Sequence, residues 1–171
     1  MEGRDFALGF CSATALILIL GYFFLPVHSA EMIASPGAED ELLSLIAGAK
    51  ESICIENYLI TSEKVMDALL NASARGVEVR VLLEKRVAGG KNMEAYEMLS
   101  AGGVQVRWAP FSFKLLHSKL LIVDGRTALI GSHNLSNSAL MENREVSVLV
   151  EGPIVAEFLE LFERDWNSPG Y

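Results

Sequence analysis

The sequence is poor in cysteine and histidine, the residues that most often build disulfide frameworks and structural metal sites. Cys11 and Cys54 are its two cysteines, and it has three histidines. Two cysteines cannot form a disulfide framework, and no Cys/His grouping has the spacing of a structural zinc site. These absences exclude a disulfide-framed scaffold and a zinc-finger type of domain.

Positive charge is also scarce. The 171 residues include 14 Lys and Arg against 22 Asp and Glu, which gives a formal net charge of −8. This balance argues against a generally basic nucleic-acid coat. A content of 51% hydrophobic and 21% charged residues excludes a disordered chain. The length is that of one domain rather than two.

A long uncharged run from Phe6 to Leu25 accounts for much of the mean hydropathy of +0.31. A helix of this length spans about 30 Å, the thickness of a bilayer's hydrocarbon core. We expect residues 1–30 to be a membrane anchor, with a helix over about 6–25, or a cleaved signal sequence. Residues 31–171 are then the folded domain. The run is longer than the apolar region of a signal peptide, which favours the uncleaved anchor.

The orientation of this anchor depends on Arg4, the basic residue beside the run. By the positive-inside rule, Arg4 places the N-terminus in the cytoplasm. The protein is then held at the membrane by a single N-terminal helix, and its domain is extracytoplasmic. If the segment is cleaved instead, the domain is secreted.

Strand-like and helix-like segments alternate along the rest of the chain. Helical spacing is predicted over 39–49, 62–75, 92–101 and 154–166. Strands are predicted over 52–60, 77–83, 104–108, 115–123, 127–130 and 145–150. Ser62 is the expected N-cap of the second helix, and Gly76 its stop. The alternation predicts an α/β domain with a mixed, mostly parallel sheet flanked by helices on both faces.

Asp124 and Gly125 form a strong hairpin signal between two of these strands. If they make a two-residue turn, Val123 pairs with Arg126, and position 117 falls opposite position 132. The hairpin then brings the segment 131–134 beside the segment 117–119.

The side chains that meet in this way suit a phosphate group. His117 and Lys119 are two residues apart on a strand and therefore share a face. Lys119 can neutralise phosphate oxygens, Ser132 and Asn134 can donate hydrogen bonds to them, and His117 can attack phosphorus.

The spacing of these residues, H-x-K-x4-D-x6-G-S-x-N, resembles the signature of the phospholipase D superfamily. Its fixed positions are filled by His117, Lys119, Asp124, Gly131, Ser132 and Asn134. The resemblance runs from about residue 39 to 166. It points to the short, single-motif branch, which holds a bacterial endonuclease and the mitochondrial cardiolipin hydrolase. The zinc-binding insertion of the mitochondrial proteins has no counterpart here, so the bacterial type is the nearer relative.

The resemblance implies a phospholipase D-like catalytic domain that cleaves phosphodiesters through a phosphohistidine, without a metal or another cofactor. The implied catalytic residues are His117, Lys119, Asp124 and Glu145, and the implied phosphate-binding residues are Lys119, Ser132 and Asn134. Glu145 would hydrogen-bond His117 and set its tautomer. For Asp124 a structural role in the turn is an open alternative. His133 stands at a variable position of the motif.

The implied reaction needs two motif histidines, and this chain supplies one. His133 is not followed by a lysine two positions on, because Leu135 stands there. The resemblance therefore implies a homodimer with a two-fold axis through a shared active site.

Two substrate classes are open. The N-terminal run favours phospholipid headgroup esters at a membrane, and the alternative is a nonspecific endonuclease acting on DNA or RNA. Residues 75–126 carry 9 basic and 5 acidic residues, whereas the segments on either side are acidic. These basic side chains either line a groove for a polyanion or scatter over several faces. The intact motif argues against a third reading, an inert membrane-tethered scaffold.

Overall fold

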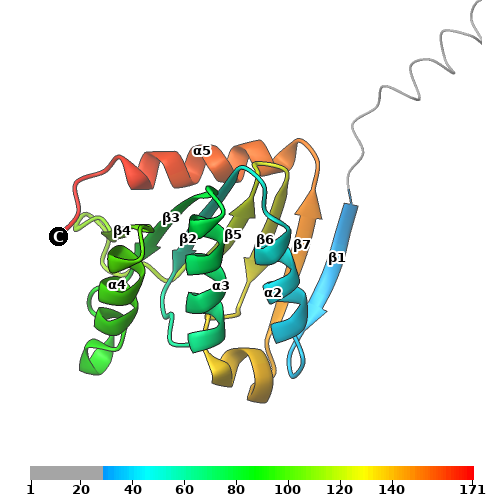
Figure 1. The fold of residues 1–171 in the computed structure, drawn as a ribbon, viewed down its shortest axis with the longest axis horizontal. Coiled ribbons are helices and arrows are strands. Elements are labelled where there is room, and N and C mark those ends of the chain that lie inside the picture. The colour runs from blue at the N-terminus through cyan, green and yellow to red at the C-terminus, as the bar shows by residue number, and fades with distance from the viewer. Residues whose placement is uncertain (1–28) are drawn as a thin grey trace, which may run out of the picture.

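A seven-stranded sheet with the order β1-β7-β6-β5-β2-β3-β4 forms the centre of the protein (Figure 1). The structure is a computed structural model, and it describes residues 29–171. The strands are β1 (Ser29–Ala34), β2 (Ser52–Asn57), β3 (Glu78–Leu83), β4 (Gln105–Trp108), β5 (Lys119–Val123), β6 (Thr127–Gly131) and β7 (Val146–Glu151). The helices are α2 (Glu39–Gly48), α3 (Glu63–Ala74), α4 (Asn92–Ala101) and α5 (Ile154–Trp166), with short helical turns η1 (Ala88–Gly90) and η2 (Ser138–Glu142).

The sheet is mixed, as predicted, but the expectation that it is mostly parallel is wrong. Strand β3 pairs in parallel with β2 and β4, whereas the other four neighbouring pairs are antiparallel. Helix crossovers join the neighbouring strands β2, β3 and β4, whereas α2 connects β2 to β1 at the far edge of the sheet. The hairpin of β5 and β6, followed by β7, returns the chain in alternating directions, and this makes its half of the sheet antiparallel.

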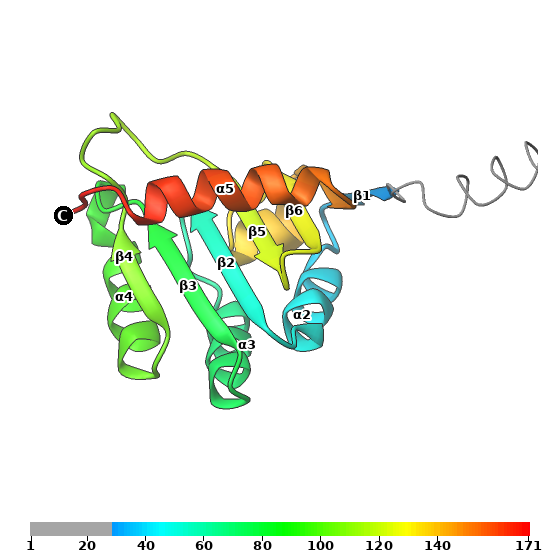
Figure 2. The ribbon, with the colours of Figure 1, turned by 90° about the horizontal axis from the view of Figure 1, so that it is seen from above.

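Helices cover both faces of the sheet, as the sequence predicts. Helices α2, α3 and α4 lie on one face, and α5 crosses the other alone (Figures 1 and 2). Each face has its own core. Leu42, Leu69 and Leu99 belong to the larger one, and Phe162 and Trp166 of α5 fill the smaller one. The rigid sheet between these cores holds the strand ends that carry the motif.

Local sequence signals fix several element boundaries. Ser62 caps α3, as predicted, because its hydroxyl accepts a hydrogen bond from the Val65 amide at 3.4 Å. Gly76 ends the turn after α3 with φ of +90°, a conformation that favours glycine. Helices α4 and α5 have the bounds that their periodicity predicts.

Strand β1 was not among the predicted strands. Residues 29–34 pair antiparallel with β7 at the edge of the sheet, and only Ile33 among them is buried. An edge strand with one buried side chain gives little hydrophobic alternation to detect. The predicted domain start at residue 31 therefore falls inside a strand.

The predicted membrane segment over residues 6–25 lies outside the described residues. Within residues 29–171, no helix combines the length and the apolar character needed to span a bilayer.

Candidate active site

The motif residues gather at the end of the sheet where β2 and β6 finish and β5 and β7 begin. Asn57 at the end of β2 pairs with Lys119 at the start of β5. Gly131 at the end of β6 pairs with Ser147 near the start of β7. The segments 117–119, 131–134 and 145–147 therefore converge, as the hairpin argument predicts.

The hairpin exists, but its predicted register is wrong by one residue. Val123 lies opposite Thr127 rather than Arg126. Asp124 and Gly125 have φ of 52° and 60°, and the Arg126 amide donates to the Val123 carbonyl at 3.0 Å. The turn is thus followed by one unpaired residue, which delays the ladder by one position.

His117 and Lys119 lie together at the exposed end of this region. The Lys119 ammonium donates a hydrogen bond to the His117 carbonyl at 2.8 Å, and the His117 side chain is exposed. Partial burial lowers the pKa of Lys119, and the nearby charge of Glu145 opposes that effect. The arrangement offers one imidazole and one cation to an incoming anion.

Tyr58 completes this pair, although the sequence analysis did not identify it. Its ring centroid lies 4.9 Å from that of His117, and the Lys119 ammonium is 5.2 Å from the Tyr58 centroid. A cation at that distance from an aromatic face is attracted to it. Tyr58 directly follows β2 but falls inside the predicted strand over 52–60, so the sequence pattern gives no signal of its contact with His117.

Ser132 and Asn134 approach from the other side of the site. The Ser132 hydroxyl accepts a hydrogen bond from the Val146 amide at 3.0 Å and lies 3.3 Å from the Val146 carbonyl. The Oδ1 atom of Asn134 is buried, and it has no hydrogen-bond partner within residues 29–171. Both residues therefore lie at the converging strand ends, where the sequence predicts them.

Gly131 permits the close approach of β6 to β7 at this point. A Cβ atom at position 131 would lie 2.4 Å from both Ser147 Cα and the Val146 carbonyl oxygen. Such contacts are not tolerated without a backbone shift, so the motif glycine is needed for packing.

Glu145 lies near the site but is not hydrogen-bonded to His117 within the part of the chain that the structure describes. Its backbone carbonyl accepts from the Ser35 amide at 3.0 Å, and its Oε1 atom accepts from Asn143 Nδ2 at 3.4 Å. Burial lowers the pKa of Lys119 and of His133, and the charge of Glu145 opposes this lowering at both.

His133 is buried and held through both ring nitrogens. Nε2 lies 2.6 Å from the Ser35 hydroxyl, and Nδ1 lies 2.6 Å from the Ser147 hydroxyl. Burial lowers the pKa of His133, and this favours the neutral ring. His133 therefore ties the segment after β6 to β7 and to the end of β1, with no ring nitrogen left for a substrate.

Asp124 lies at the opposite end of β5 from Lys119, roughly 16 Å along the strand. Its carboxylate accepts hydrogen bonds from the backbone amides of Lys50, Glu51 and Ser52 at 2.7–3.1 Å. Burial raises the pKa of Asp124, but these hydrogen bonds outweigh that effect and hold it below its ordinary value. Of the predicted catalytic residues, Asp124 is the one that the structure does not bring to the site.

A buried carboxyl group lies on the α5 face of the sheet, behind the motif. Ser118, between His117 and Lys119, donates a hydrogen bond to Glu56 Oε2 at 2.8 Å. Burial raises the pKa of Glu56 to about 7, the hydrogen bond from Ser118 opposes this, and Asp165 of α5 adds to it.

We expect this group to make the folded state less stable as the pH rises. The folded-state pKa of Glu56 lies above its ordinary value of 4.5, so its contribution is complete below about pH 4.5 and is lost as the pH passes 7. At 1.36 kcal/mol per pKa unit, the part of this loss that falls between pH 5 and pH 8 is roughly 2 to 3 kcal/mol. Urea unfolding at pH 5 and pH 8 measures it.

Glu56→Gln is expected to remove this difference, because the amide stays neutral at both pH values. Glu160→Gln, on the exposed side of α5, is the matched control and is expected to keep the wild-type dependence on pH. Equal pH dependence in the wild type and Glu56→Gln would contradict the assignment.

Within residues 29–171, no three His, Cys, Asp or Glu side chains lie close enough together to hold a metal ion. The metal-free reaction implied by the sequence stays a prediction.

The fold and the site define a class of protein. A mixed sheet with helices on both faces presents a His-Lys pair, a serine and an asparagine at one end, and this set suits an anionic phosphate group. The family described as "Cardiolipin synthase, PLD-like domain" matches residues 42–166. The chain belongs to the phospholipase D superfamily.

Two cardiolipin synthases illustrate the similarity in sequence. Cardiolipin synthase A of Proteus mirabilis is 28% identical over 151 residues, which cover 81% of this chain and 30% of that protein. Cardiolipin synthase A of Serratia proteamaculans is 31% identical over 136 residues, covering 72% and 27%. This chain thus spans less than a third of the length of these relatives.

Solved structures match over more of their length. Nuc from Salmonella typhimurium, a phospholipase D family member, has a TM-score of 0.77 and 30% identity, covering 85% of this chain and 99% of that one. NucT from Helicobacter pylori has a TM-score of 0.73, covering 85% and 100%, and at 19% identity it supports the fold alone.

Proposed function

We propose that the protein is a phosphodiester hydrolase of the phospholipase D type that works through a phosphohistidine. The observation that carries this proposal is the exposed His117 beside Lys119, with Ser132 and Asn134 converging from the next strand. A polarisable nucleophile next to a fixed cation is what attack on an anionic phosphorus centre needs.

In the first step an imidazole nitrogen of His117 forms a bond to phosphorus, and the bond from phosphorus to the leaving oxygen breaks. A second histidine protonates that oxygen. Water then attacks phosphorus, the phosphorus–nitrogen bond breaks, and the phosphate product leaves. Lys119, Ser132 and Asn134 offset the charge on the phosphate oxygens, and Glu145 offsets the charge of Lys119. For Asp124 we propose the structural role.

We propose a homodimer that shares this site, because the other histidine within residues 29–171 is not free to act on a substrate. His133 is buried with both nitrogens engaged. Met32 and Val148 are paired across β1 and β7 and are exposed at 68% and 39%. They lie on the same face of the sheet as α5, on the part that α5 does not cover. Exposed apolar side chains on adjacent strands suit contact with a second copy.

A mixing experiment tests the shared site. Wild-type chains unfolded and refolded with an equal amount of His117→Ala chains are expected to lose about half of their activity per wild-type chain, because half of them gain an inactive partner. Refolding with an equal amount of unrelated protein is the control. Activity per wild-type chain that does not change on mixing would contradict a shared site.

For the substrate we propose phospholipid headgroup esters at a membrane. The uncharged run over residues 6–25 and the similarity to cardiolipin synthases support this choice. We propose that the N-terminal helix anchors the protein, with the domain extracytoplasmic, or that the domain is secreted if the helix is cleaved.

A nonspecific endonuclease is the second candidate, favoured by the full-length match to Nuc and by a basic residue at the site end of the sheet. Lys85 follows β3 there, whereas the guanidinium of Arg86 beside it is paired with Glu84. Two other arginines of the basic middle segment are engaged elsewhere: Arg75 donates to carbonyls at the C-terminal end of α2, and Arg80 pairs with Glu163 of α5. The basic middle segment therefore scatters over several faces, and Lys85 is its member at the site end of the sheet.

The decisive experiment assays the full chain in detergent with anionic phospholipid vesicles and with single-stranded DNA and RNA, side by side in EDTA. Release of a headgroup supports the lipid hydrolase, and cleaved strands support the nuclease. Complete loss of activity in EDTA would overturn the metal-free mechanism, and no turnover of either substrate would overturn the proposed function.

A further inference from the structure

His117 is delivered to the site by an irregular segment, residues 109–118, which connects β4 to β5. The first half of this segment is held by backbone hydrogen bonds, such as Ala109 to the Leu83 carbonyl at 2.8 Å. The amide of Leu116, directly before His117, is bound by a side chain instead. Its acceptor is the carboxylate of Glu84, at 2.6 Å.

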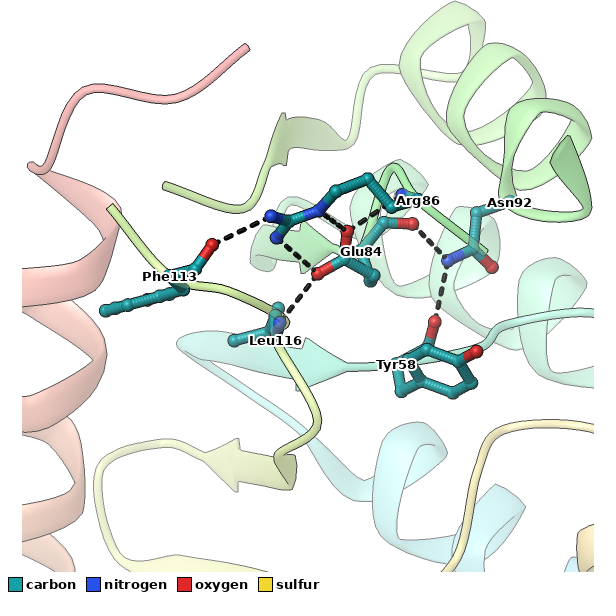
Figure 3. Close-up of polar contacts among 6 residues, drawn as sticks. All are labelled: Tyr58, Glu84, Arg86, Asn92, Phe113 and Leu116. Carbon is teal, nitrogen blue, oxygen red and sulfur yellow. Dashed lines mark hydrogen bonds and ion pairs between the residues drawn. The ribbon is translucent and has the colours of Figure 1, made fainter. Parts of the chain in front are cut away.

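Glu84 follows β3, and its carboxylate points toward Arg86 and Leu116 (Figure 3). The side chain is completely buried. Besides Leu116, its carboxylate accepts hydrogen bonds from the backbone amide, Nε and Nη2 of Arg86 at 2.6–2.9 Å. Nη1 of the same guanidinium donates to the Phe113 carbonyl at 2.8 Å. The ion pair between the buried Glu84 and the partly exposed Arg86 thus holds the segment before His117 at two points.

Asn92 extends this network to the other neighbour of His117. Its Nδ2 atom donates to the carbonyls of Glu84 and Tyr58, both at 2.8 Å (Figure 3). Its Oδ1 atom accepts from the Ile60 amide at 3.0 Å. The ring of Tyr58 lies against His117 and Lys119. The end of β3 is thereby linked to both sides of the imidazole.

We infer that Glu84 is a positioning residue for the reaction, acting with Arg86 and Asn92 to hold His117 and Tyr58 in place. The inference rests on the proposed role of His117 as nucleophile. Both oxygens of Glu84 accept hydrogen bonds, so the network needs a carboxylate and cannot use an isosteric amide equally well. Directly before His117, the irregular segment has no strand pairing within the described part of the chain that could fix the position of the exposed imidazole.

The charge state of Glu84 agrees with this role. Burial raises its pKa, but hydrogen bonds from Arg86 and from the Leu116 amide outweigh burial and keep the pKa below its ordinary value. The carboxylate is therefore ionised at neutral pH, where it can accept all of these bonds.

Glu84→Gln tests the inference, because it keeps the size of the side chain but turns an NH2 group toward donors. We expect kcat to fall about 100-fold, the size of effect that an ångström-scale misplacement of a reacting group produces. KM should change less than about threefold, since Ser132 and Asn134 remain in place. Assays run well below the melting temperature of each variant separate this effect from simple unfolding.

Arg86→Gln provides the second variant. The Arg86 side chain is 32% exposed, and when it is replaced Glu84 keeps its hydrogen bond from the Leu116 amide. If the two residues act as one unit, kcat of the double variant falls no further than that of Glu84→Gln alone. Glu78→Gln, an exposed carboxylate at the other end of β3, is the matched control and is expected to keep full activity.

A folded Glu84→Gln with kcat within about twofold of the wild type would overturn the inference. If Glu84→Gln does not fold, Arg86→Gln decides: a fall in kcat with KM retained supports the network, and unchanged kcat overturns it. Failure of the proposed function looks different, because the wild type would then be inactive or His117→Ala would remain active.

Discussion

Replacing His117 with alanine is expected to lower kcat by about 10⁴-fold or more while the protein stays folded. The imidazole is exposed, and Lys119 donates to the backbone carbonyl of His117 rather than to the ring. The fold therefore loses little when the ring is removed. The reaction loses its nucleophile, and other groups that bind the phosphate cannot replace one. Turnover of a small chromogenic phosphodiester measures the effect.

The covalent intermediate gives a second readout of the same change. Wild-type protein quenched during turnover should gain the mass of a phosphoryl adduct that is labile in acid, and His117→Ala should gain none. This separates loss of the nucleophile from loss of substrate binding. An adduct of equal yield in the variant would place the nucleophile on another residue.

His133→Asn is the matched control for removal of a histidine. Its ring bridges the hydroxyls of Ser35 and Ser147 inside the protein, so we expect a loss of about 2 kcal/mol in unfolding free energy. Turnover per folded chain should change little. The two histidines of one hairpin would then differ in kind, one acting on substrate and the other holding strands together.

Local patterns in the sequence predict the local parts of this structure well. Helices α4 and α5 have the expected bounds because each has a periodic apolar face and a clear stop, such as the glycine pair that follows Ala101. The meeting of 117–119 with 131–134 also follows from one hairpin, whose pairing is local. A single unpaired residue after the turn was enough to shift the predicted register.

Features that depend on distant parts of the chain were not predictable in this way. The direction of β5 against β2 is set by the whole connection between them, so the balance of parallel and antiparallel pairs was misjudged. Tyr58 reaches His117, and Glu84 reaches Leu116, only once three strands lie side by side. A single Tyr or Glu after a strand is not part of a sequence pattern that would predict its contact with a residue far away in the chain.

The second large effect is expected from Asp124→Ala, which should destabilise the fold by about 4 kcal/mol and leave kcat per folded chain nearly unchanged. The carboxylate accepts three backbone amides from the loop before β2, and hydrogen bonds to a charged group contribute about 1.5–3 kcal/mol each before exposure reduces them. The residue also has φ of 52°, which aspartate tolerates better than alanine. Urea unfolding and turnover measure the two quantities.

Asp124→Asn refines the experiment, because it keeps one acceptor oxygen and the tolerance of positive φ. We expect its stability to lie between those of the wild type and Asp124→Ala, with turnover again retained. Distance is the reason: Asp124 and Lys119 lie at opposite ends of β5, too far apart for both to touch one phosphate. A fall in kcat comparable to that of His117→Ala, at wild-type stability, would restore Asp124 to the catalytic residues.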